Sequence, residues 1–201
     1  MGNSDRFQWW RETYEGTRPE ELPWFSPTPD DDFLEALDRH APVPGKALDL
    51  GCGPGIHSVA LAQRGWRVTA VDVAPGAISM ATRFATRAKA RIEFVNCDVL
   101  GFRPIKGAYD LVHDRGFLHT LPKSDRRKWR KVVATALRPG GIVIAKEFVY
   151  DERRSYGPRG LTEPEVRALF SAPLGIVELA RSSFWGAGHG HESFLIVART
   201  L

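Results

Sequence analysis

Residues 46–64 read KALDLGCGPGIHSVALAQR, and the rest of the chain is organised around this stretch. Its first part, residues 47–50, predicts a short buried strand, and an apolar helical spacing begins at Ile56. Between the two lies a tight turn without room for larger side chains, built from glycines at alternate positions: Gly51, Gly53 and Gly55. A helix start beside such a turn offers free N–H groups and a positive dipole end, so we expect it to bind a carboxylate or a phosphate.

Two carboxylates narrow the choice of ligand. The dinucleotide fingerprint has a third glycine at the position that Ile56 occupies here. Asp49 precedes the turn, where a carboxylate repels a pyrophosphate but binds an ammonium group directly or through water. The next predicted strand, residues 67–71, ends at Asp72, which is placed to accept both hydroxyls of an adenosine ribose. The pattern favours S-adenosylmethionine, whose amino-acid end carries both charges, over a plain strand-to-helix turn with an acidic cap.

Three motifs in sequence order resemble those of class I S-adenosylmethionine-dependent methyltransferases: LDLGCGPG at residues 48–55, AVDVAP at residues 70–75, and a strand that ends in NCD at Asp98. The resemblance implies S-adenosyl-L-methionine as cofactor and S-adenosyl-L-homocysteine as product. It places Asp98 at the adenine amino group with Val99 beside the ring, although Asp98 also fits an exposed acid after a strand. The cofactor-binding residues that we expect are Trp24, Asp49, Gly51, Cys52, Gly53, Gly55, Asp72, Val73, Asp98, Val99 and Asp114.

Strands and helices alternate along the chain, which predicts an α/β fold with one doubly wound, mainly parallel sheet. We expect an antiparallel hairpin of residues 176–180 and 193–198, joined through residues 185–191, to close the chain. The resemblance then implies a seven-stranded Rossmann-like sheet with an antiparallel last strand. Residues 138–141 predict a turn, and the acids at residues 30–32 predict the cap of a helix.

Residues 1–29 have an unusual composition, with three of the six tryptophans and four prolines. This segment predicts either a lid over the cofactor and acceptor pocket or a strap packed on the sheet edge. Its aromatic residues before Pro23 resemble the N-terminus of the thiopurine, thiol and tellurite branch, which favours the lid for Trp24 and Phe25. Trp9 and Trp10 fit both interpretations. A methyltransferase domain, residues 30–201, follows.

Composition and charge exclude several classes of protein. The 201 residues, 43% of them hydrophobic, suit one domain with a full core, and we expect a cytoplasmic monomer or weak homodimer that binds no membrane. Residues 123–131 carry six basic residues and one acid, more positive charge than the whole chain at +4. We interpret this run as the solvated face of one helix and expect no nucleic-acid partner. Cys52 and Cys97 lack metal-ligand spacing and predict packing residues.

The fourth predicted strand, residues 109–113, delivers DRGFLHTLP to the edge of the sheet where α/β folds bind ligands. These residues resemble the DRG element of thiopurine S-methyltransferases and their bacterial relatives, as do residues 157–170 and 188–199. The resemblance implies that Arg115 stabilises an anionic sulfur, although an ion pair with a neighbouring acid fits Arg115 equally well. The substrate contacts that we expect are Phe25, Arg115, Phe117 and His119.

The acceptor is the least determined part. Methyl transfer is an in-line displacement that depends on alignment and exclusion of water, so a base is optional. The proline-rich element of nucleobase amino-methyltransferases is absent, and we expect a small-molecule acceptor with a soft atom such as a thiol. An O- or N-methyltransferase of natural-product metabolism is the alternative, in which His119 or Asp114 takes a proton.

Some other interpretations remain open from the sequence. The candidate catalytic residues are Arg115, His119 and Asp114, but a lone histidine after a strand is often structural. His189 and His191 lack a third ligand at metal spacing, so we expect no metal. A nucleotide-dependent oxidoreductase and a nucleic-acid-binding protein are the more distant alternatives.

Overall fold

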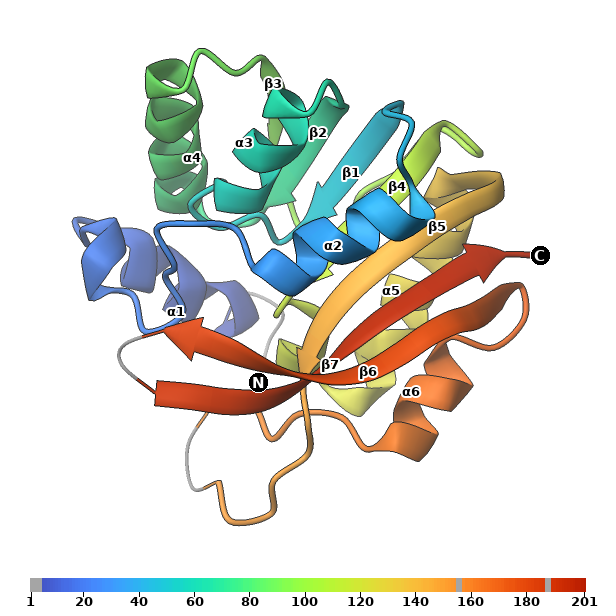
Figure 1. Cartoon of the computed structure of the whole chain (residues 1–201). Helices are drawn as coiled ribbons and strands as arrows, with labels where there is room; N and C mark the ends of the chain where they lie inside the picture. Colours follow the sequence, from blue (N-terminus) through green and yellow to red (C-terminus); the bar gives the residue numbers. More distant parts are fainter. Residues whose placement is uncertain (1–4, 155–156, 187–188) are drawn as a thin grey trace.

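The computed structural model describes residues 5–154, 157–186 and 189–201. Its seven-stranded sheet has the order β3-β2-β1-β4-β5-β7-β6 (Figure 1). Strands β1 to β5 are parallel, and β7 is antiparallel to both of its neighbours, β5 and β6. This confirms the predicted doubly wound sheet with its antiparallel last strand. The strands are β1 (Lys46–Leu50), β2 (Arg67–Asp72), β3 (Ile92–Asn96), β4 (Tyr109–Arg115), β5 (Leu137–Phe148), β6 (Leu174–Gly186) and β7 (His189–Thr200).

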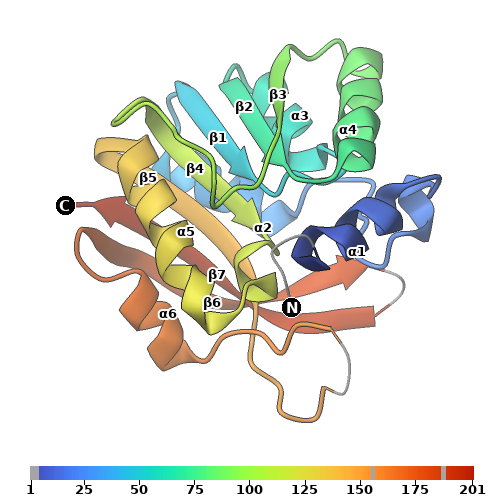
Figure 2. The same cartoon turned by 180° about the vertical axis from the view of Figure 1, so that it is seen from behind.

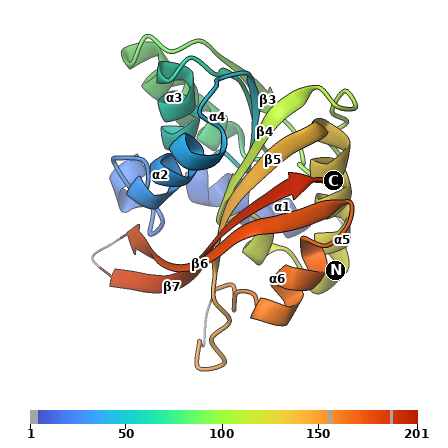
Figure 3. The ribbon, with the colours of Figure 1, turned by 45° about the vertical axis from the view of Figure 1, so that its right-hand side comes forward.

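Helices cover both faces of the sheet (Figures 2 and 3). One face carries α2 (Asp31–His40), α3 (Ile56–Gln63) and α4 (Pro75–Arg87), and the other carries α5 (Lys123–Ala136) and α6 (Glu163–Leu169). Successive side chains of a strand point to opposite faces, so the buried strands supply two apolar layers. One layer packs on Phe33 and Leu37 of α2, and the other on Trp129 of α5. No helix in the described ranges has the length and apolar character needed to cross a bilayer.

The N-terminal segment contains a helix that the sequence did not predict, α1 (Asp5–Tyr14), followed by the single turn η1 (Pro19–Glu21). Its aromatic residues pack on α4 in a small cluster with Ala74 and Met80, apart from the two main layers. Trp9 on α1 is 55% exposed, so the helix lacks the clean apolar stripe from which helices are normally predicted.

The prediction of a turn at residues 138–141 is wrong, because these residues lie inside β5. The pairing of β4 with β5 shifts there: Tyr109 faces Leu137, and Leu111 faces Ile142. Gly140 adopts a φ of +73° within this irregularity. The same glycine-rich residues therefore bulge out of a strand that continues on both sides. In the closing hairpin, residues 187–188 lie outside the described residues.

Two expectations about charged side chains are also corrected. Asp30 is the N-cap residue of α2, but its side chain makes no capping hydrogen bond. Its carboxylate instead accepts a hydrogen bond from Arg115. On α5, Arg126 is 8% exposed and donates to the carbonyls of Leu121 at 3.2 Å and Gly160 at 3.3 Å. The basic run is therefore only partly a solvated face, since Arg126 lies in the interior and ties α5 to the loop before α6.

Candidate functional site

The glycine turn lies at the carboxyl end of β1, where three positions have positive φ angles: Gly51 at +67°, Gly53 at +51° and Gly55 at +82°. A Cβ atom on Gly51 would lie 2.7 Å from the Cβ of Phe117, and one on Gly55 would lie 2.7 Å from the Cβ of Ala81. Neither distance is sterically possible without movement. The predicted glycine turn is therefore required both by backbone conformation and by space.

Asp72 holds this turn against the end of β2. Its carboxylate accepts hydrogen bonds from the N–H groups of Gly53 and Ala74, both at 2.9 Å. The side chain is 8% exposed, and burial raises its pKa despite these bonds and one from the N–H of Val73. Two carboxylate oxygens offer about four acceptor positions, so the backbone bonds leave room for ligand hydroxyls.

Asp49 lies beneath the turn, where it accepts a hydrogen bond from the hydroxyl of Ser58. It is 3% exposed, and burial, with the nearby charges of Asp114 and Asp72, raises its pKa to about 7. A ligand cation next to this carboxyl would favour its ionised form.

Asp98, Val99 and Cys52 are further residues that the sequence predicts to contact the cofactor. The carboxylate of Asp98, after β3, accepts from the N–H of Leu100 at 2.9 Å. Val99 is 2% exposed and belongs to the core. Cys52 and Cys97 are free thiols packed against the two main apolar layers, as predicted for packing residues.

Aromatic residues of the N-terminal segment cover the glycine turn. The hydroxyl of Tyr14 would lie 3.0 Å from a Cβ on Gly53, and it accepts a hydrogen bond from Nε1 of Trp24 at 2.9 Å. The rings of Trp10 and Trp24 are 5.4 Å apart, and Phe25 packs on the same cluster. The segment thus lies against α4 and the turn, at the left of Figure 1.

Arg115 ends β4 and is held in a buried ion-pair cluster. Its Nε and Nη2 atoms donate to the carboxylate of Asp30 at 2.6 and 3.1 Å, and Nη1 donates to the carbonyl of Trp24 at 3.3 Å. Lys146, its partner in register on β5, lies 3.2 Å from Asp30 and 2.9 Å from Asp32. Burial alone would raise the pKa of Asp30, but Arg115, His57 and Lys146 lower it to about 2. Of the two interpretations of Arg115 that the sequence allowed, the structure shows the ion pair with a neighbouring acid.

Asp114 lies below the acceptor edge, fully buried. Its oxygens accept from the N–H of Phe117 at 2.9 Å and from Nε1 of Trp129 at 2.7 Å. Burial and the neighbouring Glu147 raise its pKa well above the usual range. Asp114 therefore organises the loop after β4, and its carboxyl is buried away from solvent.

Glu147 is the main residue that the sequence analysis missed. It lies fully buried near the end of β5, and its Oε2 accepts from the backbone N–H of His119 at 2.9 Å. Nδ1 of His119, in the short turn η2 (Leu118–Thr120), is 2.8 Å from the same oxygen. Burial raises the pKa of Glu147 to about 8 and lowers that of His119 to about 3. The sequence does carry a signal for Glu147, because Lys146 and Glu147 are two adjacent charged residues inside an otherwise apolar stretch of β5.

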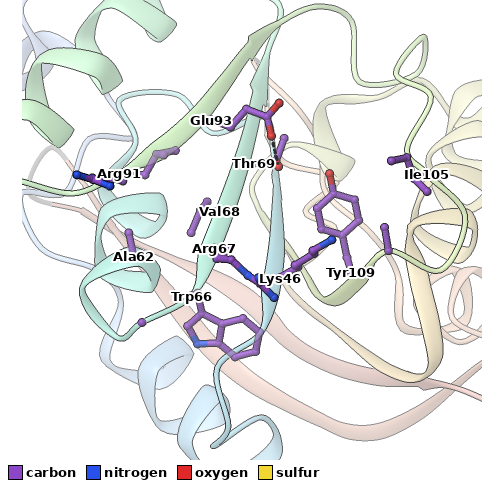
Figure 4. Close-up of a pocket in the computed structure, with 13 residues that line it drawn as sticks. Lys46, Ala62, Trp66, Arg67, Val68, Thr69, Arg91, Glu93, Ile105 and Tyr109 are labelled. Atoms are coloured by element: carbon purple, nitrogen blue, oxygen red, sulfur yellow. Dashed lines mark hydrogen bonds between the residues drawn. The ribbon is translucent and has the colours of Figure 1, made fainter.

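A hollow of about 640 Å³ lies at the other end of the strands (Figure 4). Lys46 and Arg67, which begin β1 and β2, line it together with Arg91 and Glu93, and all four side chains are exposed. Thr69 donates a hydrogen bond to Glu93 at 2.9 Å. None of the predicted site residues lines this hollow.

Comparison with known proteins gives a family match and several relatives. Residues 47–141 match the family described as "Methyltransferase domain". The 2-heptyl-1-hydroxyquinolin-4(1H)-one methyltransferase of Mycobacteroides abscessus is 27% identical, over 90% of this chain and 82% of that protein. The probable thiol methyltransferase 2 of Arabidopsis thaliana is 29% identical, over 83% of this chain and 72% of that protein.

Solved structures show the same fold. The N-methyltransferase NodS from Bradyrhizobium japonicum, solved in complex with S-adenosylhomocysteine, superposes with a TM-score of 0.75 at 22% identity. The match covers 97% of this chain and 98% of that one. The Rossmann-like fold therefore extends over nearly the full length of the chain.

Proposed function

Because the chain is an S-adenosylmethionine-dependent methyltransferase of small molecules, we propose that its acceptor is an atom that is already ionised, a thiolate in the first place. The observation that carries this proposal is the state of the acids and bases at the acceptor edge. Asp114 is fully buried, and at neutral pH Glu147 is protonated and His119 is neutral. The ionised carboxylate next to the end of β4, that of Asp30, is held in ion pairs with Arg115 and Lys146 and does not serve as a free base.

The residues around the glycine turn fit the cofactor. The open first turn of α3 suits its carboxylate, Asp49 its ammonium group, and Asp72 its ribose hydroxyls. When bound, S-adenosylmethionine supplies a methyl group on a positively charged sulfur.

Residues 5–29 act as the lid of this site. Tyr14 already lies over Gly53, and Trp24 is linked both to Tyr14 and to Arg115. Arg115 therefore serves the reaction by fixing the lid, and the aromatic side chains of Phe25 and Phe117 supply an apolar wall that excludes water.

A thiolate is favoured by the resemblance of residues 114–122 to the thiopurine branch and by the Arabidopsis relative described as a thiol methyltransferase. The second candidate is an ionised N-hydroxy or phenolic oxygen on a flat ring. The Mycobacteroides relative, named for a hydroxyquinolone, favours this candidate. Neither candidate needs a base where the acceptor is an aromatic thiol, an N-hydroxy heterocycle or a phenol acidic enough to ionise near neutral pH.

A methyl-transfer panel tests the proposal. Aromatic thiols, an N-hydroxyquinolone, phenols, alkyl amines, iodide and tellurite are assayed at one pH with S-adenosylmethionine. We expect turnover to follow the ionised fraction of the acceptor, with thiols first. Methylation of amines or unactivated alcohols, with ionised acceptors untouched, would contradict the proposal and leave the methyltransferase assignment intact.

A further inference from the structure

Two groups converge on one nitrogen of His119. The backbone N–H of Phe148 donates to Nδ1 at 3.1 Å, and Oε2 of Glu147 lies 2.8 Å from the same atom. An imidazole nitrogen carries either one in-plane lone pair or one proton. Because a backbone N–H is always a donor, Nδ1 must offer its lone pair, and the proton of the neutral ring is on Nε2.

The contact with Glu147 agrees with this assignment only if Glu147 carries a proton. An ionised oxygen 2.8 Å from the lone pair of Nδ1 would be repelled, whereas a carboxylic acid donates to it. Glu147 is fully buried and faces the buried carboxyl of Asp114, so ionising both acids together is costly. Burial has the largest effect on the pKa of Glu147 and raises it to about 8, although the hydrogen bond with Asp114 and that from the N–H of His119 lower it.

The free edge of the ring faces the DRG element. Nε2 makes no hydrogen bond with any residue in the described ranges. A Cβ on Gly116 would lie 3.8 Å from Nε2, and the ring stacks on Phe148 with centroids 4.2 Å apart. Phe184 packs against the same imidazole in a T-shaped contact. The guanidinium carbon of Arg115 lies 4.7 Å from the centroid of the Phe184 ring. The Nε2–H group thus lies beside the loop that follows β4.

We propose that His119 is a neutral Nε2–H donor to the ionised acceptor, and that Glu147 is the positioning residue that fixes this tautomer. This inference rests on the proposed function and deepens it. The bond from the acceptor atom to the methyl carbon forms as the carbon–sulfur bond breaks, and its electron pair stays on sulfur. No proton moves, so the site selects aromatic thiols, N-hydroxy heterocycles and acidic phenols, which arrive as anions.

Charged groups from every neighbouring element keep the imidazole neutral. Burial has the largest effect on the pKa of His119 and lowers it, while Asp114 on β4 raises it. Arg154 after β5, Arg126 on α5 and Arg115 on β4 lower it further. His119 is therefore neutral above about pH 3 and Glu147 is protonated below about pH 8, so between these values the pH dependence of the reaction belongs to the acceptor.

Glu147→Gln is the decisive variant. The glutamine amide donates to Nδ1 as the protonated acid does, but it leaves the backbone N–H of His119 without its acceptor. We therefore expect kcat/KM to fall by about 10- to 100-fold, the scale of one buried unsatisfied donor. The pH profile should still follow the pKa of the acceptor. If His119 were instead a general base with its Nδ1 proton on an ionised Glu147, the variant would stabilise the wrong tautomer. A loss of about 10⁴-fold, as in a serine protease triad, would then overturn the proposal.

His119 itself gives the second readout. His119→Ala removes the donor to an anion, and we expect kcat/KM to fall about tenfold or more, equally at each pH. His119→Gln keeps an N–H donor and should recover part of this loss. A loss in His119→Ala that disappears at high pH, where acceptors ionise without help, would identify a base and contradict the inference.

Nitrogen-15 NMR of the histidine rings tests the tautomer without any assay of activity. We expect His119 to show a proton on Nε2 and none on Nδ1 between about pH 6 and 8. His40, whose Nε2 lies 2.6 Å from Glu178 near the surface, serves as the reference, and His40→Gln assigns its signals. A proton on Nδ1 of His119 overturns the inference. Failure of the acceptor panel alone would remove the proposed function and leave this measurement valid.

Discussion

At the two ends of the parallel strands, the pKa values of the carboxyl groups are shifted in opposite directions. At the amino end, Asp110 accepts from the N–H of Lys46 at 2.8 Å and pairs with Arg138 at 2.5 Å. Burial there is slight, and the two partners lower the pKa of Asp110. At the carboxyl end, Asp49 and Glu147 are buried, and burial raises their pKa values to about 7 and 8.

The open hollow and the acids with raised pKa values therefore lie at opposite ends of the strands. The hollow of about 640 Å³ is at the amino end, among exposed side chains that water solvates. The carboxyl end is closed by the N-terminal segment, yet it holds the strained glycines and the perturbed acids. Burial that shifts pKa values is typical of functional sites, so we expect the functional site at the carboxyl end and not at the hollow.

The largest expected effect comes from a methyl group added at each end. Gly51 and Gly107 have φ angles of +67° and +66°, but a Cβ at Gly51 meets Phe117 at 2.7 Å, whereas at Gly107 the nearest atom is 3.7 Å away. We expect Gly51→Ala to lower the free energy of unfolding by about 2–5 kcal/mol, from backbone strain plus overpacking. Gly107→Ala should cost about 1–2 kcal/mol. Equal losses in urea melts would show that crowding at the carboxyl end contributes nothing.

An ion pair at each end gives the next comparison. Arg115 is 12% exposed and Arg138 is 52% exposed. Arg115→Ala leaves the buried Asp30 short of a partner, so we expect a loss of about 3 kcal/mol. Arg138→Ala should cost about 0.2–1 kcal/mol, as for other surface pairs. Thermal unfolding measures both, and a larger loss for Arg138→Ala would contradict the described burial.

The third comparison is a difference in the sign of the pH dependence of stability. The folded state holds a proton on Asp49 up to about pH 7, while the unfolded chain loses it near 3.8, so stability falls as pH rises between these values. Asp49→Asn should remove this fall, a slope of at most about 1.4 kcal/mol per pH unit. Asp110, with its lowered pKa, stabilises the fold as pH rises toward its ordinary value, and Asp110→Asn should remove that weak rise. Matching slopes in the two variants would refute the contrast.

Much of the carboxyl end follows from local sequence. The strand, turn and helix of residues 46–64, and the position of Asp72 at the end of β2, were predicted and confirmed. These features depend on residue types with strict backbone or burial requirements, so a single chain reveals them. The partners of Arg115 and the site of Glu147 were not predicted, because both depend on contacts between distant strands.

Other failures have specific physical causes. Helix α1 lacks a regular apolar stripe, since its tryptophans pack on one another as well as on α4. Residues 138–141 carry turn-forming residues, but the strands around them pair on both sides and absorb them as an irregularity. Arg126 lies in a basic run, and only the packing of α5 against the loop at Gly160 decides that it is buried. Tertiary contacts decided each outcome.

The central claim is that the closed carboxyl end, and not the open hollow, binds the cofactor. Calorimetric titration of S-adenosylhomocysteine into the parent, Asp72→Ala and Glu93→Ala tests it most directly, with circular dichroism to verify folding. We expect tight binding by the parent and by Glu93→Ala, whose residue lines the hollow. Asp72→Ala should bind about 1–3 kcal/mol more weakly, because the ribose hydroxyls lose a charged acceptor. Unchanged binding in a folded Asp72→Ala variant, or loss of binding in Glu93→Ala, would contradict the account.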